Sequence, residues 1–557
     1  MMKHPKIPEQ LLVFAGSLLF FLLTLAANLS GPHDSINYLN GIIKGGEHLS
    51  HPHHLLYHYS AYYWLHITSA IFPGIRDYYL VESFTAFCGS ISMAIVYSFF
   101  RWRFNWKPWP SILFSSVIAF SYGMWFYSTN IEVYAPAMMF LLASLYILAS
   151  PDFSMKDVWK VSVLHCLAVV YHQLHILFAI VILWILFTRR KQLKLLPALA
   201  VYAITGLVLV GGAYFYMGWV VAGQDSMDQW VGWMRGYTTH HDYWQWPGAN
   251  TPSHVFTGFS HAFVGGHFVF RLPGIDSYFD KLRATHSLHD EIFLAQHISK
   301  GTAIFLTALT ILLAIVTLLL VVRFIRRYRS VKTKWPTVIP PLIVCGAVYS
   351  AFFCVWMPEI LEFWIFQTVL FWLLLLGTLT VTGFPKIKAV TAGIALSLSL
   401  FIINYFGSIR WLQDLDHDWY YLKVKPVQKI IRENDVVLLQ QGWILKDFVE
   451  YFTKADVTEV PVLPHLRPAV DSTLNDHLSR GGRIIIYPEV NSMSSLPETQ
   501  YVDSLLSRYE HERLMFKSTD PEIIIISPDS SNPPDSSNLP DSGNLPDSGN
   551  QKIPVAK

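Results

Sequence analysis

The sequence predicts an α-helical polytopic membrane protein with about eleven transmembrane helices, a small C-terminal α/β domain outside the cytoplasm and a disordered tail. Three observations predict this class. Hydrophobic residues make up 52% of the 557 residues and charged residues only 14%, whereas a soluble chain is about 25% charged. Apolar segments long enough to cross a bilayer core of about 30 Å recur along the first 409 residues. From residue 410 onward, short apolar runs alternate with helical patterns.

Apolar segments of spanning length are the strongest pattern in the chain. The first runs from Leu11 to Leu29 and contains no charged residue. The segment from Val158 to Thr188 is barely long enough for two crossings, so a short or re-entrant pair is an alternative there. The predicted crossings begin at Leu11, Tyr79, Ser111, Tyr134, Val158, Gln173, Leu195, Gly301, Thr337, Leu361 and Ala389.

Lysine and arginine residues gather in every second loop, in six clusters from Lys3 and Lys6 to Lys386 and Lys388. Because basic loops stay in the cytoplasm, this pattern predicts an integral inner-membrane protein with a cytoplasmic N-terminus. An odd number of crossings then puts the C-terminal domain in the periplasm. On the outer side, this orientation places Asp34, Glu132, His172, Glu359, Glu362 and the loop 222–300.

The composition divides the chain into three parts. Residues 1–409 form the transmembrane domain, with interfacial loops at 30–78 and 222–300, the second of which is rich in Trp, Tyr, His and Gly. Residues 410–527 form the periplasmic α/β domain. Residues 528–557 repeat a six-residue unit of Pro, Asp, Ser, Asn, Gly and Leu, which has too few apolar side chains to fold.

Four short apolar runs in the C-terminal domain predict buried strands at Val436–Leu439, Val460–Leu463, Ile484–Tyr487 and Ile523–Ile526. Helical patterns lie between them, at Ile444–Phe452, Ala469–Ser479 and Thr499–Glu510. Strands that alternate with helices predict a mostly parallel sheet.

Composition and cysteine spacing exclude several classes of function. The net charge of +2, with no basic block that contains interleaved aromatic residues, gives no sign of nucleic-acid binding. All four cysteines lie within apolar runs and form no CxxC pair, which favours buried side chains over a disulfide framework or a zinc site. No Gly-rich phosphate-binding motif occurs. We expect no cofactor. The sequence does not exclude a divalent metal ion, but no motif supports one.

Three ionisable residues are the candidates for chemistry at the outer face. Asp34, in Gly-Pro-His-Asp-Ser, follows the first crossing directly, whereas Glu132 and His172 each lie in a short outer loop. An ionisable group at the mouth of a helix bundle is costly unless it is partnered or hydrated, so its presence indicates function. The alternative for each is a boundary residue in contact with water. Asp34 is the strongest candidate, because an enzyme with a lipid-linked substrate would hold its base in such a place.

A histidine-rich segment follows Asp34 and reads HPHHLLYHYSAYYWLH from His51 to His66. His54, His58, Tyr62 and His66 recur every four residues, which predicts one face of an interfacial amphipathic helix. Three interpretations stay open for these side chains: contact with a phosphate or headgroup, a zinc-binding pair, and polar tips that face water. No Glu completes an HExxH frame.

The order of these features resembles the multi-pass glycosyltransferases of the GT-C superfamily, closest to the bacterial families that are similar to protein O-mannosyltransferases. The resemblance covers roughly residues 10–190 and implies a GT-C-like fold. This chain departs from the pattern in having His53 where relatives often show a second Pro, and one Asp in place of an Asp-x-Asp pair. The matching residues are Asp34, the run from His51 to Tyr57, Trp125, Glu132-Val133-Tyr134 and His172.

The resemblance implies an inverting transferase that moves a sugar from a polyprenyl-phosphate donor to an acceptor hydroxyl at the outer face. Asp34 would act as the general base, with Glu132 as a second catalytic residue. The acceptor is a protein, a lipid or a glycan, and the sequence does not select among these. Groups that could meet the leaving phosphate by charge or hydrogen bond are His51, His53, His54, His172, Arg235, Arg271 and Lys281.

Other classes of membrane protein are weighed against this one. A transporter would show inverted repeats and broken helices near the midplane, and we find no internal repeat. An O-antigen ligase or polymerase would place basic residues in one large outer loop, which the loop 222–300 could resemble. A receptor or scaffold that acts through the C-terminal domain is the remaining alternative.

Overall fold

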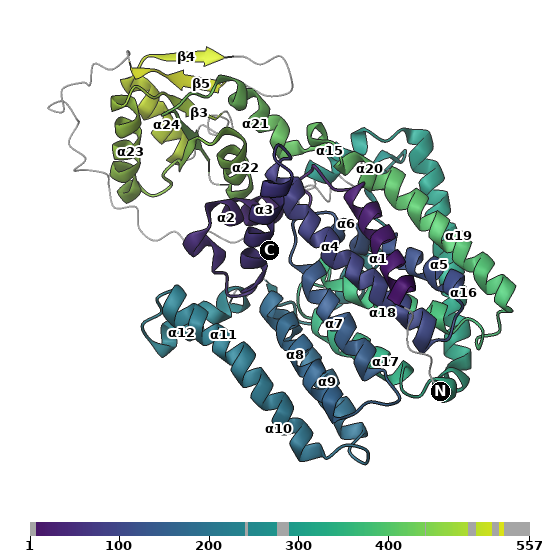
Figure 1. Cartoon of the computed structure of the whole chain (residues 1–557). Helices are drawn as coiled ribbons and strands as arrows, with labels where there is room; N and C mark the ends of the chain where they lie inside the picture. The colour runs from purple at the N-terminus through teal and green to yellow at the C-terminus, as the bar shows by residue number, and fades with distance from the viewer. Residues whose placement is uncertain are drawn as a thin grey trace. The chain divides into compact units, whose positions relative to one another are not determined.

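The computed structural model describes residues 7–239, 243–275, 289–440, 442–487, 497–514 and 523–528. The chain divides into two compact units, Met1–Leu422 and Lys423–Lys557, whereas the change in composition starts the second domain at 410. The first unit is helical and the second contains a sheet (Figure 1). The repeat predicted to be disordered lies outside the described residues, except for Pro528.

A helix corresponds to each of the predicted crossings. Continuous helical segments that are long and apolar enough to cross a membrane are 77–103, 195–221, 300–334 and 386–412. α5 and α9 are much shorter than the roughly 20 residues that a crossing needs, so the number of crossings stays a prediction. The helices are α1 (Ile7–Leu22), α4 (Asp77–Ser98), α5 (Pro108–Ala119), α7 (Tyr134–Leu148), α8 (Met155–Tyr171), α9 (Phe178–Thr188), α10 (Leu195–Gly206), α16 (Lys300–Lys334), α17 (Ile339–Phe353), α18 (Ile365–Gly377) and α19 (Lys386–Asn404).

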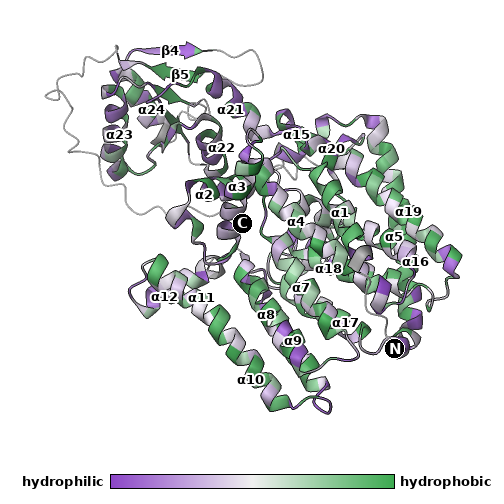
Figure 2. Ribbon diagram, in the orientation of Figure 1, coloured by the Kyte–Doolittle hydropathy of each residue, from purple (hydrophilic) through white to green (hydrophobic). Residues whose placement is uncertain are grey.

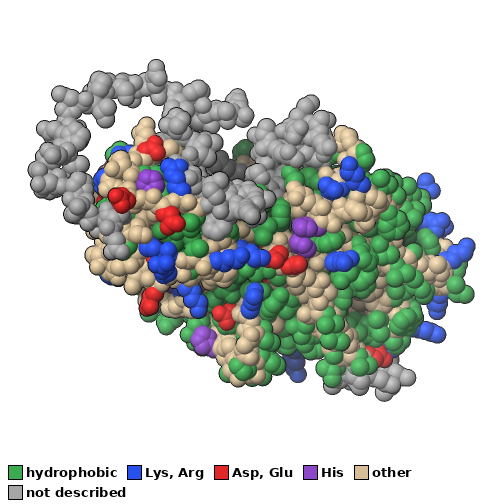
Figure 3. All heavy atoms as spheres, turned by 90° about the horizontal axis from the view of Figure 1, so that it is seen from above, with side chains coloured by type: hydrophobic (Ala, Val, Ile, Leu, Met, Phe, Trp, Pro, Cys, Tyr) green, Lys and Arg blue, Asp and Glu red, His purple; other side chains and the backbone are tan. Residues whose placement is uncertain are grey.

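Exposed apolar side chains mark the helices that face outward from the first unit. Leu196, Ile204 and Leu207 on and next to α10 are exposed, and most of α10 is hydrophobic in Figure 2. Figure 3 shows hydrophobic side chains gathered over the right-hand part of the face that it displays, and Ile311 and Leu318 of α16 are also exposed. A helix that is apolar on its outward side is typical of contact with lipid.

Glycines allow the helices of the first unit to approach closely. A Cβ atom at Gly89 of α4 would lie 2.4 Å from the Ser128 hydroxyl at the end of α6 (Tyr122–Ser128). A Cβ atom at Gly377 of α18 would lie 2.6 Å from the Phe104 ring. The contact at Gly89 holds the end of α6, just before the loop that contains Glu132, against α4.

The segment after α1, which is predicted to lie on the outer side, forms α2 (Ser35–Lys44), η1 (Gly46–Leu49) and α3 (Tyr57–Ile71). The helix that carries the predicted histidine face begins at Tyr57, so it includes His58 but not His54. His51, His53 and His54 precede the helix, in a segment that contains turns. Pro52 disfavours helical backbone at His51, the residue before it, so a helix that includes His51 is not expected.

Short helices also fill the described parts of the loop 222–300. They are α12 (Met227–Arg235), η6 (Gly236–Thr239), α13 (Thr251–His261), η8 (His267–Arg271) and α15 (His289–Gln296). Helices were expected here, and their position at a membrane surface stays a prediction.

The second unit contains a five-stranded sheet with strand order β2-β1-β3-β5-β4. β1 pairs in parallel with β2 and β3, whereas β5 pairs antiparallel with β3 and β4, so the prediction of a mostly parallel sheet is wrong. Strands β1, β3 and β5 lie where the apolar runs predict them. The strands are β1 (Val436–Leu439), β2 (Asp456–Glu459), β3 (Ile484–Ile486), β4 (His511–Leu514) and β5 (Ile523–Ile526).

The two errors in strand placement are at the sheet edges. β2 ends at Glu459, just before the predicted run, and β4 contains a predominantly polar sequence that no pattern selected. Edge strands are only half covered, so they need no continuous apolar run. Helices α22 (Trp443–Thr453), α23 (Arg467–Ser479) and α24 (Pro497–Arg508) correspond to the three helical patterns.

Candidate active site

Asp34 lies at the N-terminal end of α2, and its side chain is open to solvent. The Tyr38 hydroxyl, one turn later, donates a hydrogen bond to Asp34 Oδ2 at 3.2 Å. The same hydroxyl lies 3.4 Å from His54 Nε2. Tyr38 thus joins the carboxylate to the histidine segment, as the sequence had placed them near each other.

The surroundings of Asp34 make it a stronger base than an ordinary aspartate. Crowding by protein atoms raises the pKa of Asp34, and the hydrogen bond from Tyr38 opposes part of that rise. A carboxylate that solvent reaches and whose pKa is raised can accept a proton from an approaching hydroxyl group.

Glu132 lies in the turn between α6 and α7 and is 1% exposed. Its Oε1 atom has no hydrogen-bond partner among the described residues, and Oε2 accepts from the Val133 amide at 3.3 Å. Burial, and then the charges of Asp34 and Glu362, raise the pKa of Glu132 well above its usual value. Glu132 therefore favours the neutral acid, which can donate a hydrogen bond.

Glu362, in η9 (Leu361–Trp364), is a third carboxylate of this site that the sequence did not select. It accepts a hydrogen bond from the Tyr134 hydroxyl at 2.6 Å and from the Tyr127 hydroxyl at 3.1 Å. The charge of Glu362 raises the pKa of Glu132, and the charge of Asp34 raises the pKa of both Glu132 and Glu362. The available signal was its outer loop, which has two acids and no Lys or Arg between Trp356 and Glu362.

The histidines form a cluster of rings beside the carboxylates. The His54 ring lies 4.9 Å from the rings of His51 and His172, and the His172 ring is 5.1 Å from that of Tyr134. His53 joins the cluster through its carbonyl, which accepts from the Gln173 amide at 2.9 Å. The structure thus brings together the four histidines that the sequence proposed for substrate contact.

These histidines are neutral at ordinary pH. Burial, and to a smaller degree the neighbouring His53, lowers the pKa of His51 to about 4. Burial likewise lowers the pKa of His172 to about 3 and that of His54 well below its usual value. They can offer hydrogen bonds to an anion, but they bring no full positive charge.

The two arginines proposed for substrate contact have different surroundings. Arg235 ends α12, and the next residue, Gly236, lies so close to His53 that a Cβ there would be 2.3 Å from Nε2. Arg271 Nε donates to the Ile298 carbonyl at 3.0 Å, and no described contact joins it to the cluster. Lys281 lies outside the described residues.

Within the described ranges, no group of three or more His, Cys, Asp or Glu residues has the arrangement of a metal site.

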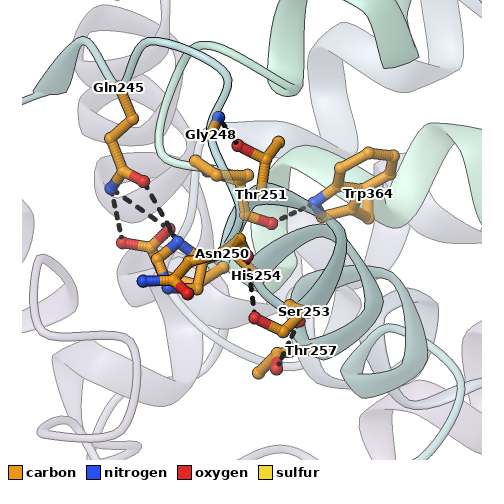
Figure 4. Close-up of polar contacts among 10 residues, drawn as sticks. Gln245, Gly248, Asn250, Thr251, Ser253, His254, Thr257 and Trp364 are labelled. Carbon is orange, nitrogen blue, oxygen red and sulfur yellow. Dashed lines mark hydrogen bonds and ion pairs between the residues drawn. The ribbon is translucent and has the colours of Figure 1, made fainter.

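A network of outer loops holds the segment that contains Glu362 (Figure 4). Gln245 Nε2 donates to both carboxylate oxygens of Glu359, at 3.0 and 3.3 Å, while its Oε1 lies 3.2 Å from His254 Nδ1. Trp364 Nε1 donates to the Pro358 carbonyl at 2.9 Å. The loop 355–362 is therefore fixed on both sides of Glu359.

An apolar groove of about 600 Å³ lies between α1, α3 and α4. Its walls include Leu22, Trp64, Phe72 and Phe87, and the Trp64 indole donates to the Ser83 hydroxyl at 2.8 Å. His58, on an adjacent face of α3, has its ring 5.2 Å from that of Tyr38. The helix α3 thus contributes both to the groove and to the cluster around Asp34.

The structure is similar to several solved glycosyltransferases. It matches ArnT from Cupriavidus metallidurans bound to undecaprenyl phosphate at 11% identity and a TM-score of 0.49, over 94% of this chain and 98% of that one. It matches the Archaeoglobus fulgidus oligosaccharyltransferase at 13% identity and a TM-score of 0.42, over 93% and 74% of the two chains.

The S. cerevisiae protein O-mannosyltransferase Pmt1-Pmt2 complex bound to its sugar donor matches at 15% identity and a TM-score of 0.28, over 48% of this chain and 37% of that one. No protein-family model matches this chain, and no curated protein sequence does. The Pmt1-Pmt2 complex is a protein of the kind that the sequence is predicted to resemble. At these TM-scores, the roles of individual residues depend on the geometry described above.

Proposed function

We propose that this protein is an integral-membrane glycosyltransferase that moves a sugar from a polyprenyl-phosphate donor to an acceptor hydroxyl at the outer face of the membrane. The observation that carries the proposal is the cluster itself. A solvent-open carboxylate, Asp34, lies beside the buried Glu132, the partly buried Glu362 and a cluster of neutral histidines. An apolar groove on the other face of α3 is suited to a prenyl chain.

In the proposed reaction, the acceptor oxygen forms a bond to the anomeric carbon as the bond from that carbon to the phosphate oxygen breaks. Asp34 takes the hydroxyl proton, and the prenyl phosphate leaves with the bonding electrons. Direct displacement inverts the anomeric configuration. Base assistance of this kind contributes roughly 10²–10⁴-fold in rate.

The growing charge on the leaving phosphate needs hydrogen-bond donors that are already in place. We assign this part to His51, His53, His54 and His172. Arg235 is the candidate cation, because the residue after it, Gly236, lies against His53. Glu132, as a neutral acid, is suited to donate a hydrogen bond to the sugar or the phosphate. The proposal needs no cofactor.

The proposal includes an orientation. The N-terminus lies in the cytoplasm, the protein resides in the inner membrane, and the second unit lies in the periplasm. The alternation of basic loops supports this arrangement. The second unit is the candidate for acceptor binding.

The decisive experiment compares lipid-linked sugars and glycoconjugates, by mass spectrometry, in cells with and without the gene. Loss of one product names donor and acceptor together. Membranes that contain Asp34→Asn, given a labelled polyprenyl-phosphate sugar, should transfer none of it. The matched control is Glu47→Gln, which removes an exposed acid from the same outer segment and should keep full activity. Full activity in the Asp34 variant removes Asp34 as the base.

A further inference from the structure

The backbone that leads into Asp34 has an unusual and tightly fixed conformation. His33 has a φ of 62°, in the left-handed region that residues other than glycine seldom adopt. The His33 amide donates to the Ser30 carbonyl at 3.0 Å and the Asp34 amide to the Pro32 carbonyl at 2.7 Å. Such a conformation costs on the order of 1 kcal/mol and persists only where the surroundings hold it.

A buried carboxylate from the far end of the first unit holds this loop. Asp418 is fully buried, and its Oδ2 accepts hydrogen bonds from the amides of Leu29 at 2.8 Å and Ser30 at 3.0 Å. Its Oδ1 accepts from the amides of Tyr420 at 2.9 Å and Tyr421 at 3.0 Å. One carboxylate therefore ties two segments that are 388 and 389 residues apart in sequence.

Further contacts fix the same loop on either side of Asp418. The amides of Ala27 and Asn28 both donate to the Leu412 carbonyl, at 2.8 and 3.0 Å. The Ser35 hydroxyl, just after the base, donates to the Ile131 carbonyl at 2.9 Å. This last contact places α2 against the turn that contains Glu132.

We propose that Asp418 is a positioning residue of the active site, which fixes Leu29 and Ser30 so that Asp34 meets the acceptor hydroxyl in the right place. The proposal depends on the proposed function, in which Asp34 is the base. Only a carboxylate suits the position, because all four described partners are N–H donors. An asparagine would turn its own NH₂ group toward two of them and leave them without an acceptor.

The test uses the full-length protein with Asp418→Asn. We expect kcat to fall about 10–100-fold, since a misplacement of about 1 Å in a catalytic group can cost about 10²-fold. The KM for the prenyl-phosphate sugar should stay within about twofold, because Asp418 does not touch the donor site. The matched control is Asp414→Asn, which removes an exposed acid from the same loop and should leave kcat unchanged. An unchanged kcat in the folded Asp418 variant overturns the proposal.

A double-mutant cycle separates positioning from a general structural role. Asp34→Glu moves the base carboxylate by one methylene and should retain a measurable rate. If Asp418 acts through Asp34, adding Asp418→Asn to this variant should reduce kcat by less than about threefold. If the kcat of the double variant falls by the product of the two single losses, Asp418 acts independently of Asp34.

Hydrogen exchange tests the anchor without any transfer assay. In Asp418→Asn, peptides that span residues 24–34 should exchange about 10–100 times faster, whereas peptides from α22 should not change. Unchanged exchange at residues 24–34 overturns the anchor. If the wild-type protein transfers no sugar but the exchange at residues 24–34 changes as expected, the proposed function is rejected. The role of Asp418 in holding the loop is then retained.

Discussion

At the scale of residues, three carboxylates share one site but have different partners. Asp34 is open to solvent, Glu132 is buried with one oxygen unpartnered among the described residues, and Glu362 receives two tyrosine hydroxyls. Acids that lie together are assigned different roles by their environments. In the proposed reaction, Asp34 is the proton acceptor and Glu132 the neutral donor. Burial raises the pKa of Glu362 to about 7, and the hydrogen bonds from its two tyrosines oppose that rise.

Tyr134→Phe should reduce kcat about tenfold, and Tyr127→Phe should reduce it less. Each variant removes one donor from the partly buried Glu362 carboxylate, and a typical hydrogen bond contributes about 0.5–1.5 kcal/mol. The bond from Tyr134 is shorter, 2.6 Å against 3.1 Å. Steady-state kinetics of both variants in membranes check the order. Equal wild-type rates in both would remove Glu362 from the mechanism.

The histidine cluster should make the protein less stable in mild acid. The pKa of His51 falls from 6.5 to about 4 in the fold, so in this range the unfolded chain binds the proton more readily. Stability that is present above pH 6.5 is therefore lost as the pH falls toward 4. Thermal unfolding in detergent at pH 7, 5.5 and 4.5 measures this loss, and His51→Asn should lose less than the wild type. Parallel slopes for the two proteins would contradict the assignment.

At the scale of elements, the sequence predicts best where an element is apolar throughout. The central strands β1, β3 and β5 and the helices near each predicted crossing are found where their runs of Val, Ile and Leu place them. The edge strands β2 and β4 were misplaced or missed, because half of each faces solvent and the apolar signal is lost.

The same limit applies to the site. Asp34, His51, His53 and His54 lie in one segment of the sequence, so their proximity was predictable from that segment. Glu362 reaches Tyr134 from 228 residues away, and Asp418 reaches Ser30 from 388 residues away. No local pattern encodes such contacts, because they arise from how the helices pack.

Asn404 of α19 ties two loops of the first unit, and Asn404→Ala should lower its stability by on the order of 3 kcal/mol. Its Nδ2 donates to the carbonyls of Phe120 and Phe263, at 2.7 and 2.9 Å, and its Oδ1 accepts from the Gly265 amide at 3.0 Å. Alanine leaves these buried groups unpaired, which is costly.

The control for this prediction is Ser397→Ala on the same helix, which removes one hydroxyl pair with Ser116 and should cost about 1 kcal/mol. Thermal unfolding of both variants in one detergent gives the comparison. Equal losses would mean that Asn404 does not anchor these loops.

At the scale of the whole molecule, two units share one chain, and the helix α21 (Trp419–Ile430) continues from the first into the second. If the second unit selects the acceptor, removing it should change which acceptors are used and leave sugar transfer itself in place. The choice of the cut matters, since Asp418 lies just before α21.

A chain that ends at Ile430 should retain transfer to a small soluble acceptor, whereas a chain that ends at Asp414 should lose it. The shorter chain lacks Asp418, so the loop before Asp34 has no anchor. Transfer assays with both chains, normalised to the amount in the membrane, check the difference. An unchanged acceptor range in the longer chain would count against selection by the second unit.

Asp418 occupies the N-cap of α21 as well as the loop of the base. A single side chain therefore joins the first turn of α21 to the loop that precedes Asp34. Under the proposed function, an acceptor that displaces this turn would also displace the proposed base, so acceptor binding and proton removal would be coupled through Asp418.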